Sequence, residues 1–233
     1  MKRVLFSVVI TWLCWLVTSV QAESPLRVPD FSGWELSFGS GSGSGNFGLG
    51  YTGFGITATD RSVVAISGDV STVSLRYRWS LPHTPFYLGA GSTMYSGSLG
   101  GVRQWSIAGA TATFAYASDT LYTFGVQAGY NPPAVPQLYL YGGAGVAVGN
   151  LTVRGSVQYE QDSVVSQVTG LAIGPTLSGG IEYAFSKHGR LGLDVTNISF
   201  AGDLPCYHGQ CGQLRATVDQ TIVTLQVGWN WKF

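Results

Sequence analysis

The sequence predicts an all-β protein, an eight-stranded antiparallel up-and-down β-barrel that crosses a membrane. Residues 221–233 (TIVTLQVGWNWKF) alternate between apolar and mostly polar positions, and a tilted strand needs only about 9–11 residues to cross a bilayer. Only 10% of the 233 residues are charged, against roughly 25% in soluble domains. A strand in lipid also implies a closed barrel, because an open edge would leave backbone groups unpaired.

Residues 1–22 are predicted to be a cleaved signal peptide, which leaves residues 23–233 as the barrel domain. Lys2 and Arg3 form a basic start, residues 4–17 are mostly apolar, and the small Ala22 suits the cleavage position. A retained anchor is the alternative. No run of eighteen apolar residues follows Ala22, so we expect no spanning helix.

Period-two alternation and proline or glycine punctuation place the strands. The eight predicted strands are residues 33–39, 72–80, 86–95, 119–130, 137–148, 170–185, 190–200 and 221–233.

The first predicted strand has Trp34, Leu36 and Phe38 on one face, and a Gly-Ser run follows it. The second, residues 72–80, alternates hydrophobic residues with Ser and Arg, and Pro82 and Pro85 end it. The third strand follows directly at residues 86–95.

The fourth strand alternates Tyr, Phe, Val and Ala with small or polar residues until a proline-rich stop at residues 131–136. The facing of residues 137–148 stays open, because Tyr139 and Tyr141 compete with Leu138 and Leu140 for the apolar face. Strand 170–185 alternates over its full length, and Pro175 is expected either at a bulge or above the bilayer, because proline cannot donate a ladder hydrogen bond.

The turn at residues 186–189 leads into strand 190–200, and strand 221–233 closes the chain. The connections alternate between long and short, as in outer-membrane barrels with long outer loops and short periplasmic turns. The long loops are predicted around residues 47–70, 96–118, 149–169 and 201–220.

Aromatic residues gather near the short-turn ends, as expected for an interfacial girdle. Its predicted members are Trp34, Trp79, Trp229, Trp231 and Phe233. A soluble eight-stranded barrel is the alternative fold, but its outer face would carry Lys and Glu. The non-apolar faces here are mostly Gly, Ser, Thr and Gln.

The polar faces of the strands predict an ion-paired network that fills the lumen. Its predicted members are Glu35, Arg76, Arg78, Gln127, Glu182, Asp194 and Lys232. The interior of an eight-stranded barrel is just wide enough for side chains to fill. We therefore expect little or no open pore.

Cys206 and Cys211 are predicted to form a small disulfide in the last outer loop, since no further ligand cluster suggests a metal site. The ring would act as a staple or as a preorganised contact tip. The only histidines after residue 22 are His83, His188 and His208, and no strand places one beside a serine nucleophile. We therefore predict no catalytic site, no cofactor and no metal.

Residues 170–233 resemble the small outer-membrane β-barrel proteins of Gram-negative bacteria, the opacity-protein and OmpA-membrane-domain-like group. The resemblance rests on GGIEYAF at residues 179–185, LGLDV at residues 191–195 and the terminal WKF at residues 231–233. It implies an outer-membrane location and a C-terminal signal, ending in Phe233, that the outer-membrane assembly machinery reads. Adhesins, structural proteins and evasion factors all occur in this group.

We therefore expect a structural or surface-contact (adhesin-like) protein surrounded by outer-membrane lipids, with a host or surface ligand bound through the outer loops. A narrow channel for small solutes is the first alternative, and an outer-leaflet lipid-modifying enzyme is the second. Without Lys2 and Arg3, 10 of the 12 basic residues remain against 12 acidic ones. That balance gives no basic patch for nucleic acid.

Overall fold

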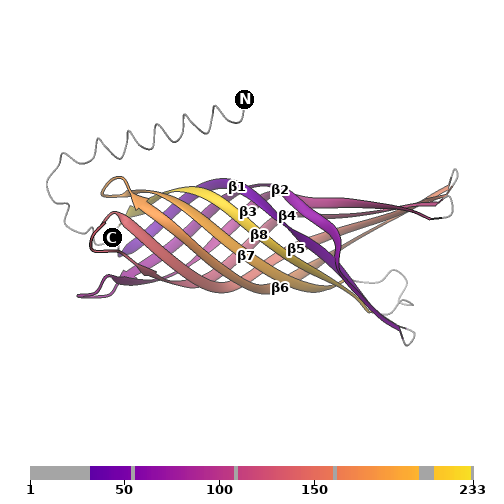
Figure 1. Cartoon of the computed structure of the whole chain (residues 1–233), viewed down its shortest axis with the longest axis horizontal. Coiled ribbons are helices and arrows are strands. Elements are labelled where there is room, and N and C mark those ends of the chain that lie inside the picture. Colours follow the sequence, from indigo (N-terminus) through magenta and orange to yellow (C-terminus); the bar gives the residue numbers. More distant parts are fainter. Residues whose placement is uncertain (1–31, 54–55, 108–109, 160–161, 205–212, 232–233) are drawn as a thin grey trace, which may run out of the picture.

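The chain folds into a closed antiparallel barrel. The computed structural model describes residues 32–53, 56–107, 110–159, 162–204 and 213–231. The strands in these ranges are β1 (Gly33–Gly53), β2 (Ile56–Ser80), β3 (Phe86–Ile107), β4 (Ala110–Tyr130), β5 (Leu138–Tyr159), β6 (Asp162–Ala184), β7 (Gly189–Leu204) and β8 (Gln213–Trp231). Each strand pairs with the next and β8 pairs with β1, as Figure 1 shows. The predicted eight-stranded fold is confirmed.

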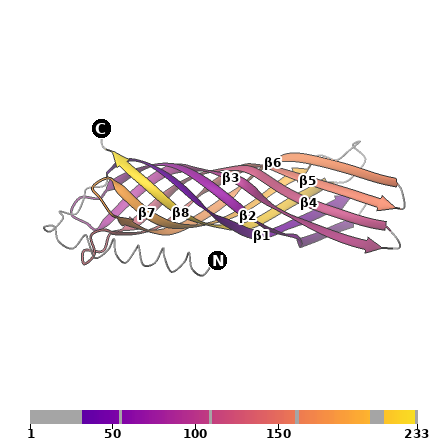
Figure 2. The same cartoon turned by 90° about the horizontal axis from the view of Figure 1, so that it is seen from above.

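The described strands are 16 to 25 residues long, so most of the predicted boundaries were too narrow. The predicted long loops at residues 47–70, 96–118, 149–169 and 201–220 are largely strand. A 22-residue strand such as β3, tilted by about 40°, rises roughly 55 Å, about twice the apolar band of about 25 Å. Figures 1 and 2 show this elongated shape.

The Gly-Ser run after Phe38 is part of β1 and of its ladder with β8. It pairs continuously with β8 from Trp34 opposite Trp231 to Thr52 opposite Gln213. Glycine leaves room for neighbouring side chains where β1 lines the narrow lumen. A Cβ on Gly43 would lie 2.6 Å from Cδ2 of Leu99, so a larger residue would displace that buried side chain.

The short turns at residues 81–85, 131–137 and 185–188 lie at one end of the barrel. In outer-membrane barrels the short turns face the periplasm, so we assign this end to the periplasm. At this end the outer surface is apolar and the interior is polar. On β8, Val223, Leu225, Val227 and Trp229 are exposed, while the alternate residues Thr224, Gln226 and Asn230 are buried.

Toward the opposite end of the barrel the arrangement is reversed, with apolar residues inside and polar residues outside. Ile222 and Val218 of β8 are fully buried inside the barrel, whereas Asp219 is exposed outside. The same change occurs on β7. Its inward-facing residues change from the polar Thr196 to the apolar Ile198 and Phe200 toward the outer end. The outer half is therefore built like a soluble barrel, with an apolar core and a polar surface. These segments lack an apolar outer face, which is why their sequence pattern predicted loops.

At the outer end the barrel divides into two sheets. The β2–β3 ladder ends at Ser67 opposite Gly100, while β3 and β4 stay paired to Ile107 opposite Ala110. Arg103 reaches across this seam, and its Nη1 donates to the carbonyl oxygen of Val63 at 3.1 Å. Figure 1 shows the strand ends diverging in two groups.

The structure also decides the facing of β5 and the geometry at Pro175. Tyr139 and Tyr141 are buried in the lumen, while Leu140 is exposed. Pro175 lies opposite Val146 in an unshifted β5–β6 register, so the first of its two expected placements, a bulge, is absent from this ladder. Among the described residues, no helix is long and apolar enough to span a membrane.

Candidate functional site: the barrel lumen

The lumen near the periplasmic end holds a compact cluster of five charged side chains. Its members are Glu35 on β1, Arg76 and Arg78 on β2, Glu182 on β6 and Arg190 on β7. Each lies on the inward face of its strand and is at most 8% exposed. Sequence alternation alone therefore directs these residues to the same space.

Every arginine of this charged cluster contacts both carboxylates. The six N···O distances range from 2.7 Å for Arg78–Glu182 to 3.3 Å for Arg78–Glu35 and Arg190–Glu182. Because β2 and β6 stand opposite each other in the ring of eight strands, the Arg78–Glu182 contact spans the lumen. At the height of the charged cluster, the lumen is therefore closed by contacts between opposite walls.

A tyrosine ring backs each of the three guanidinium groups. The guanidinium carbon lies 5.7 Å from the Tyr141 ring for Arg76, 5.3 Å from the Tyr87 ring for Arg78, and 5.2 Å from the Tyr139 ring for Arg190. A ring face attracts a cation, and does so more strongly where water is excluded. The rings thus complete the packing around the buried charges.

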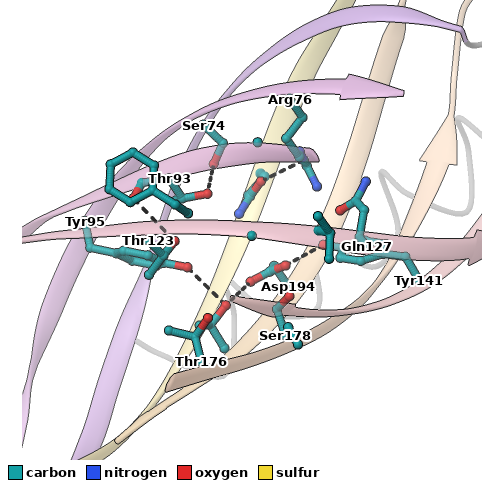
Figure 3. Close-up of a pocket in the computed structure, with 17 residues that line it drawn as sticks. Ser74, Arg76, Thr93, Tyr95, Thr123, Gln127, Tyr141, Thr176, Ser178 and Asp194 are labelled. Carbon is teal, nitrogen blue, oxygen red and sulfur yellow. Dashed lines mark hydrogen bonds between the residues drawn. The ribbon is translucent and has the colours of Figure 1, made fainter. Parts of the chain in front are cut away.

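A polar layer lies above the charged cluster, on the side away from the periplasmic end. Figure 3 shows residues of this layer together with Arg76. Asp194 accepts hydrogen bonds from the Tyr141 hydroxyl at 2.5 Å and from the Thr196 hydroxyl at 2.7 Å. Nη2 of Arg76 donates to Oε1 of Gln226 at 3.2 Å. These groups surround a cavity of about 60 Å³, which has room for only about two water molecules.

A second contact crosses the lumen in this polar layer. The Tyr95 hydroxyl on β3 donates to the Thr196 hydroxyl on β7 at 3.0 Å, and these two strands are also opposite in the ring. Thr93 donates to Ser74 at 2.9 Å on the neighbouring wall. The cavity is therefore a small polar chamber between contacting walls.

The outer half of the lumen holds an apolar layer. The Phe47 ring on β1 lies 5.0 Å from the Tyr116 ring and 5.7 Å from the Phe114 ring, both on β4. Leu121, Leu151, Ile198 and Ile222 are at most 1% exposed in the same cluster. Burial raises the pKa of the Tyr116 phenol, so this ring stays neutral and the layer carries no charge there.

The predicted lumen residues divide among these layers. Glu35, Arg76, Arg78 and Glu182 meet in the charged cluster, and Asp194 lies one layer above. Gln127 is half-buried and lines the polar cavity. Lys232 lies outside the described residues.

Arg190 was missing from the predicted network. It has the same alternation phase as Gly192 and Asp194, which the sequence placed on the polar face. This signal was hidden because Arg190 is the first residue of the predicted strand and lies next to the turn. The third base of the cluster is thus Arg190.

The aromatic girdle lies where the alternation places it, for the residues that can be described. Trp34, Trp79 and Trp229 are 37%, 46% and 56% exposed at the periplasmic end, and Trp231 is half-buried. Phe233 lies outside the described ranges. The same holds for Cys206, Cys211 and His208, so the disulfide stays a prediction.

The other two histidines occupy the short turns. His83 is exposed in the β2–β3 turn with a positive φ of 60°, and Nδ1 of His188 contacts the carbonyl oxygen of Asn230 at 3.0 Å. Within the described ranges, no group of three or more His, Cys, Asp or Glu side chains could hold a metal ion.

Comparison with known proteins is consistent with this geometry. Residues 19–233 match the family described as "Outer membrane protein beta-barrel domain". The outer membrane protein OprG from Pseudomonas aeruginosa is 10% identical, with a TM-score of 0.50 over 88% of this chain and 99% of that chain. AlkL, solved in lipid bilayers, is 17% identical with a TM-score of 0.45 over 92% and 98%.

The attachment invasion locus protein Ail of Yersinia pestis is 13% identical, with a TM-score of 0.35 over 86% of this chain and 99% of that chain. A comparison with curated protein sequences found no match. At such identities the likeness to OprG supports the fold alone.

Proposed function

We propose that this chain, which belongs to the outer membrane protein β-barrel domain family, is a non-conducting outer-membrane barrel that carries a rigid surface-contact module. The observation that carries the proposal is lumen closure at successive heights by Arg78–Glu182, Tyr95–Thr196 and Phe47–Tyr116. A continuous water path would have to displace an ion-paired cluster, a hydrogen-bonded layer and an apolar core.

The outer half supports the contact role. Long paired strands continue beyond the apolar band, and their outward residues are mostly polar or small, with Val102 as an exposed exception. Ser42 of β1 lies opposite Asp69 of β2 on this surface, and Asp203 of β7 lies opposite Arg215 of β8. An apolar core under a polar surface makes these sheets stiff, so they can present the outer connections at a fixed height above the lipid.

The narrow-channel alternative would use the polar cavity, but the cross-lumen contacts argue against a continuous path. The enzyme alternative depended on His208, which lies outside the described residues. Both alternatives make predictions different from those of the contact role, because a channel needs an open lumen and an enzyme needs a nucleophile beside a base.

Shortening one hairpin of the outer half tests the contact role. Gly101 lies opposite Tyr116 in the β3–β4 ladder, so residues 102–115 can be replaced with an Asn-Gly turn, which suits a tight hairpin. In cells lacking the gene, the full-length chain should restore attachment to surfaces or host matrix, whereas the shortened chain should be inserted but fail to attach. Equal attachment by the two inserted chains would contradict the role of this hairpin.

The matched control is a chain with Ser71 replaced by Ala. Ser71 is an exposed position on β2, and its substitution leaves every hairpin at full length. Insertion of all three chains is compared by the shift in electrophoretic mobility between heated and unheated samples. A shortened chain that does not insert is replaced by one shortened at the β5–β6 hairpin, where Val153 lies opposite Val168.

A further inference from the structure

A hollow at the periplasmic end of the barrel is distinct from the polar cavity above the charged cluster. Its volume is about 620 Å³, and it lies between the β2–β3 turn and the β4–β5 turn. Typical small-molecule pockets have volumes of about 300–1,000 Å³. We call this hollow the periplasmic pocket. It lies at the end of the barrel opposite to the surface-contact module.

Arg78 lines this pocket while being only 1% exposed. Its Nη2 atom serves both Glu35 and Glu182, but Nε and Nη1 are buried without a hydrogen-bond partner among the described residues. A guanidinium carries five N–H donors, and burying such donors without acceptors costs free energy. The pocket therefore meets a charged side chain with spare donor capacity.

The charged cluster holds three guanidinium groups, of Arg76, Arg78 and Arg190, against the two carboxylates of Glu35 and Glu182. Asp194, one layer above, is a third carboxylate and accepts from the neutral hydroxyls of Tyr141 and Thr196, so the charges of these lumen groups balance. Of these charged groups, Arg78 is the one that lines the pocket. Because arginine stays protonated in proteins, the charge next to the pocket is that of a cation.

The remaining walls of the pocket are largely apolar. Phe86, Tyr87 and Tyr139 contribute aromatic rings, and Pro85 and Leu81 come from the β2–β3 turn. Ligand pockets typically combine apolar walls with a few polar groups that fix orientation. These walls suit an aromatic or aliphatic body, while Arg78 suits an acidic group on it.

We propose that the periplasmic pocket binds a small carboxylate with an apolar body, such as an aryl-alkanoate, which enters from the periplasm. The carboxylate lies against the Arg78 guanidinium at the inner end of the pocket, and the body packs against Phe86 and the tyrosine rings. This site goes beyond the proposed surface-contact function and does not depend on it, because the two lie at opposite ends of the barrel.

The test is isothermal titration of the purified full-length barrel in lipid nanodiscs with three probes. Phenylacetate carries both features, phenylacetamide keeps the ring without the charge, and acetate keeps the charge without the ring. Phenylacetate should bind at least about tenfold more tightly than either control, since hydrogen bonds to charged groups are the stronger class. Equal heats for phenylacetate and phenylacetamide would show partition into lipid and overturn the proposal.

Two variants locate the binding. Ser80 lines the pocket at an exposed position outside the charged cluster, so Ser80→Trp should fill the pocket and abolish phenylacetate binding while the barrel still folds. Ser71→Trp, on the same strand but away from the pocket, should bind normally. Binding that survives Ser80→Trp, or no binding by the unmodified barrel at millimolar phenylacetate, would refute the site. Arg78→Lys should weaken binding of phenylacetate and leave any response to phenylacetamide unchanged.

Discussion

Nη2 of Arg78 lies 2.7 Å from Oε1 of Glu182, although their strands, β2 and β6, stand on opposite walls of the barrel. The two residues are 104 positions apart in the chain, and only ring closure brings them together. Glu182 also contacts Arg76 and Arg190. A single carboxylate therefore holds three cations from two walls in a buried space.

Glu182→Gln should destabilise the barrel strongly. It leaves three buried guanidinium groups with Glu35 as the remaining carboxylate, and breaking a buried ion pair by removing one partner costs about 3–5 kcal/mol. The free energy of unfolding, measured by urea titration in detergent micelles, checks this. Asp69→Asn, an exposed site, serves as the control and should change stability by less than about 0.5 kcal/mol.

The double variant Glu182→Gln with Arg190→Met separates charge imbalance from general damage. Removing one cation restores the original excess of one positive charge in the cluster, so part of the lost stability should return. A double variant less stable than Glu182→Gln alone would argue that Arg190 contributes mainly through its packing on Tyr139.

The charged cluster was largely predictable from the sequence. Glu35, Arg76, Arg78 and Glu182 lie on alternation phases set by unambiguous apolar neighbours such as Leu75 and Ile181. The phase predicts which face a side chain occupies, and in a lumen this narrow the inward charges at one height must meet. The sequence did not predict which charges pair with each other, because the register between opposite walls depends on the stagger of the whole ring.

The outer half was not predictable in the same way. Phe47, Val64 and Phe200 are buried apolar residues on strand segments whose outward positions are mostly polar or small. Their pattern is that of a soluble barrel, and a search for a lipid-facing stripe rejects it. On β8 the apolar residues change from the outer face at Val223 to the inner face at Ile222. This change marks the start of the outer half in the sequence.

Phe47→Ala should destabilise the outer half of the barrel. Phe47 is fully buried and stacks on Tyr116, and truncating a buried Phe typically costs about 3–5 kcal/mol. Limited proteolysis of the folded protein should show faster cleavage beyond the apolar band. The lipid-facing control Phe38→Ala, at a position 57% exposed, should leave the cleavage rate nearly unchanged; a larger effect of Phe38→Ala would contradict this assignment.

Single-cysteine probes can map the height at which the facing inverts. In a background with Cys206 and Cys211 replaced by Ser, a fluorophore at Val223 should be quenched by nitroxide-labelled lipid tails. A fluorophore at Asp219 should respond instead to a water-soluble quencher, because this exposed position lies beyond the apolar band. Equal quenching of both probes by labelled lipid would place the outer half inside the bilayer.

Deleting Phe233 tests the role of the C-terminal residue in assembly. If the assembly machinery reads this residue, the deletion should reduce the amount of inserted barrel in cells more than it reduces refolding into detergent micelles. The comparison uses the same heat-dependent mobility shift for both samples. Equal losses in the two settings would mean that Phe233 serves only as an interfacial anchor.

Current recording from the purified full-length barrel in planar lipid bilayers tests lumen closure most directly. With the Arg78–Glu182, Tyr95–Thr196 and Phe47–Tyr116 contacts in place, inserted protein should give no steady conductance steps above the bilayer background. Insertion is verified in the same preparation by protease protection. Regular steps of nanosiemens size from verified, folded protein would contradict the closed lumen and favour the channel.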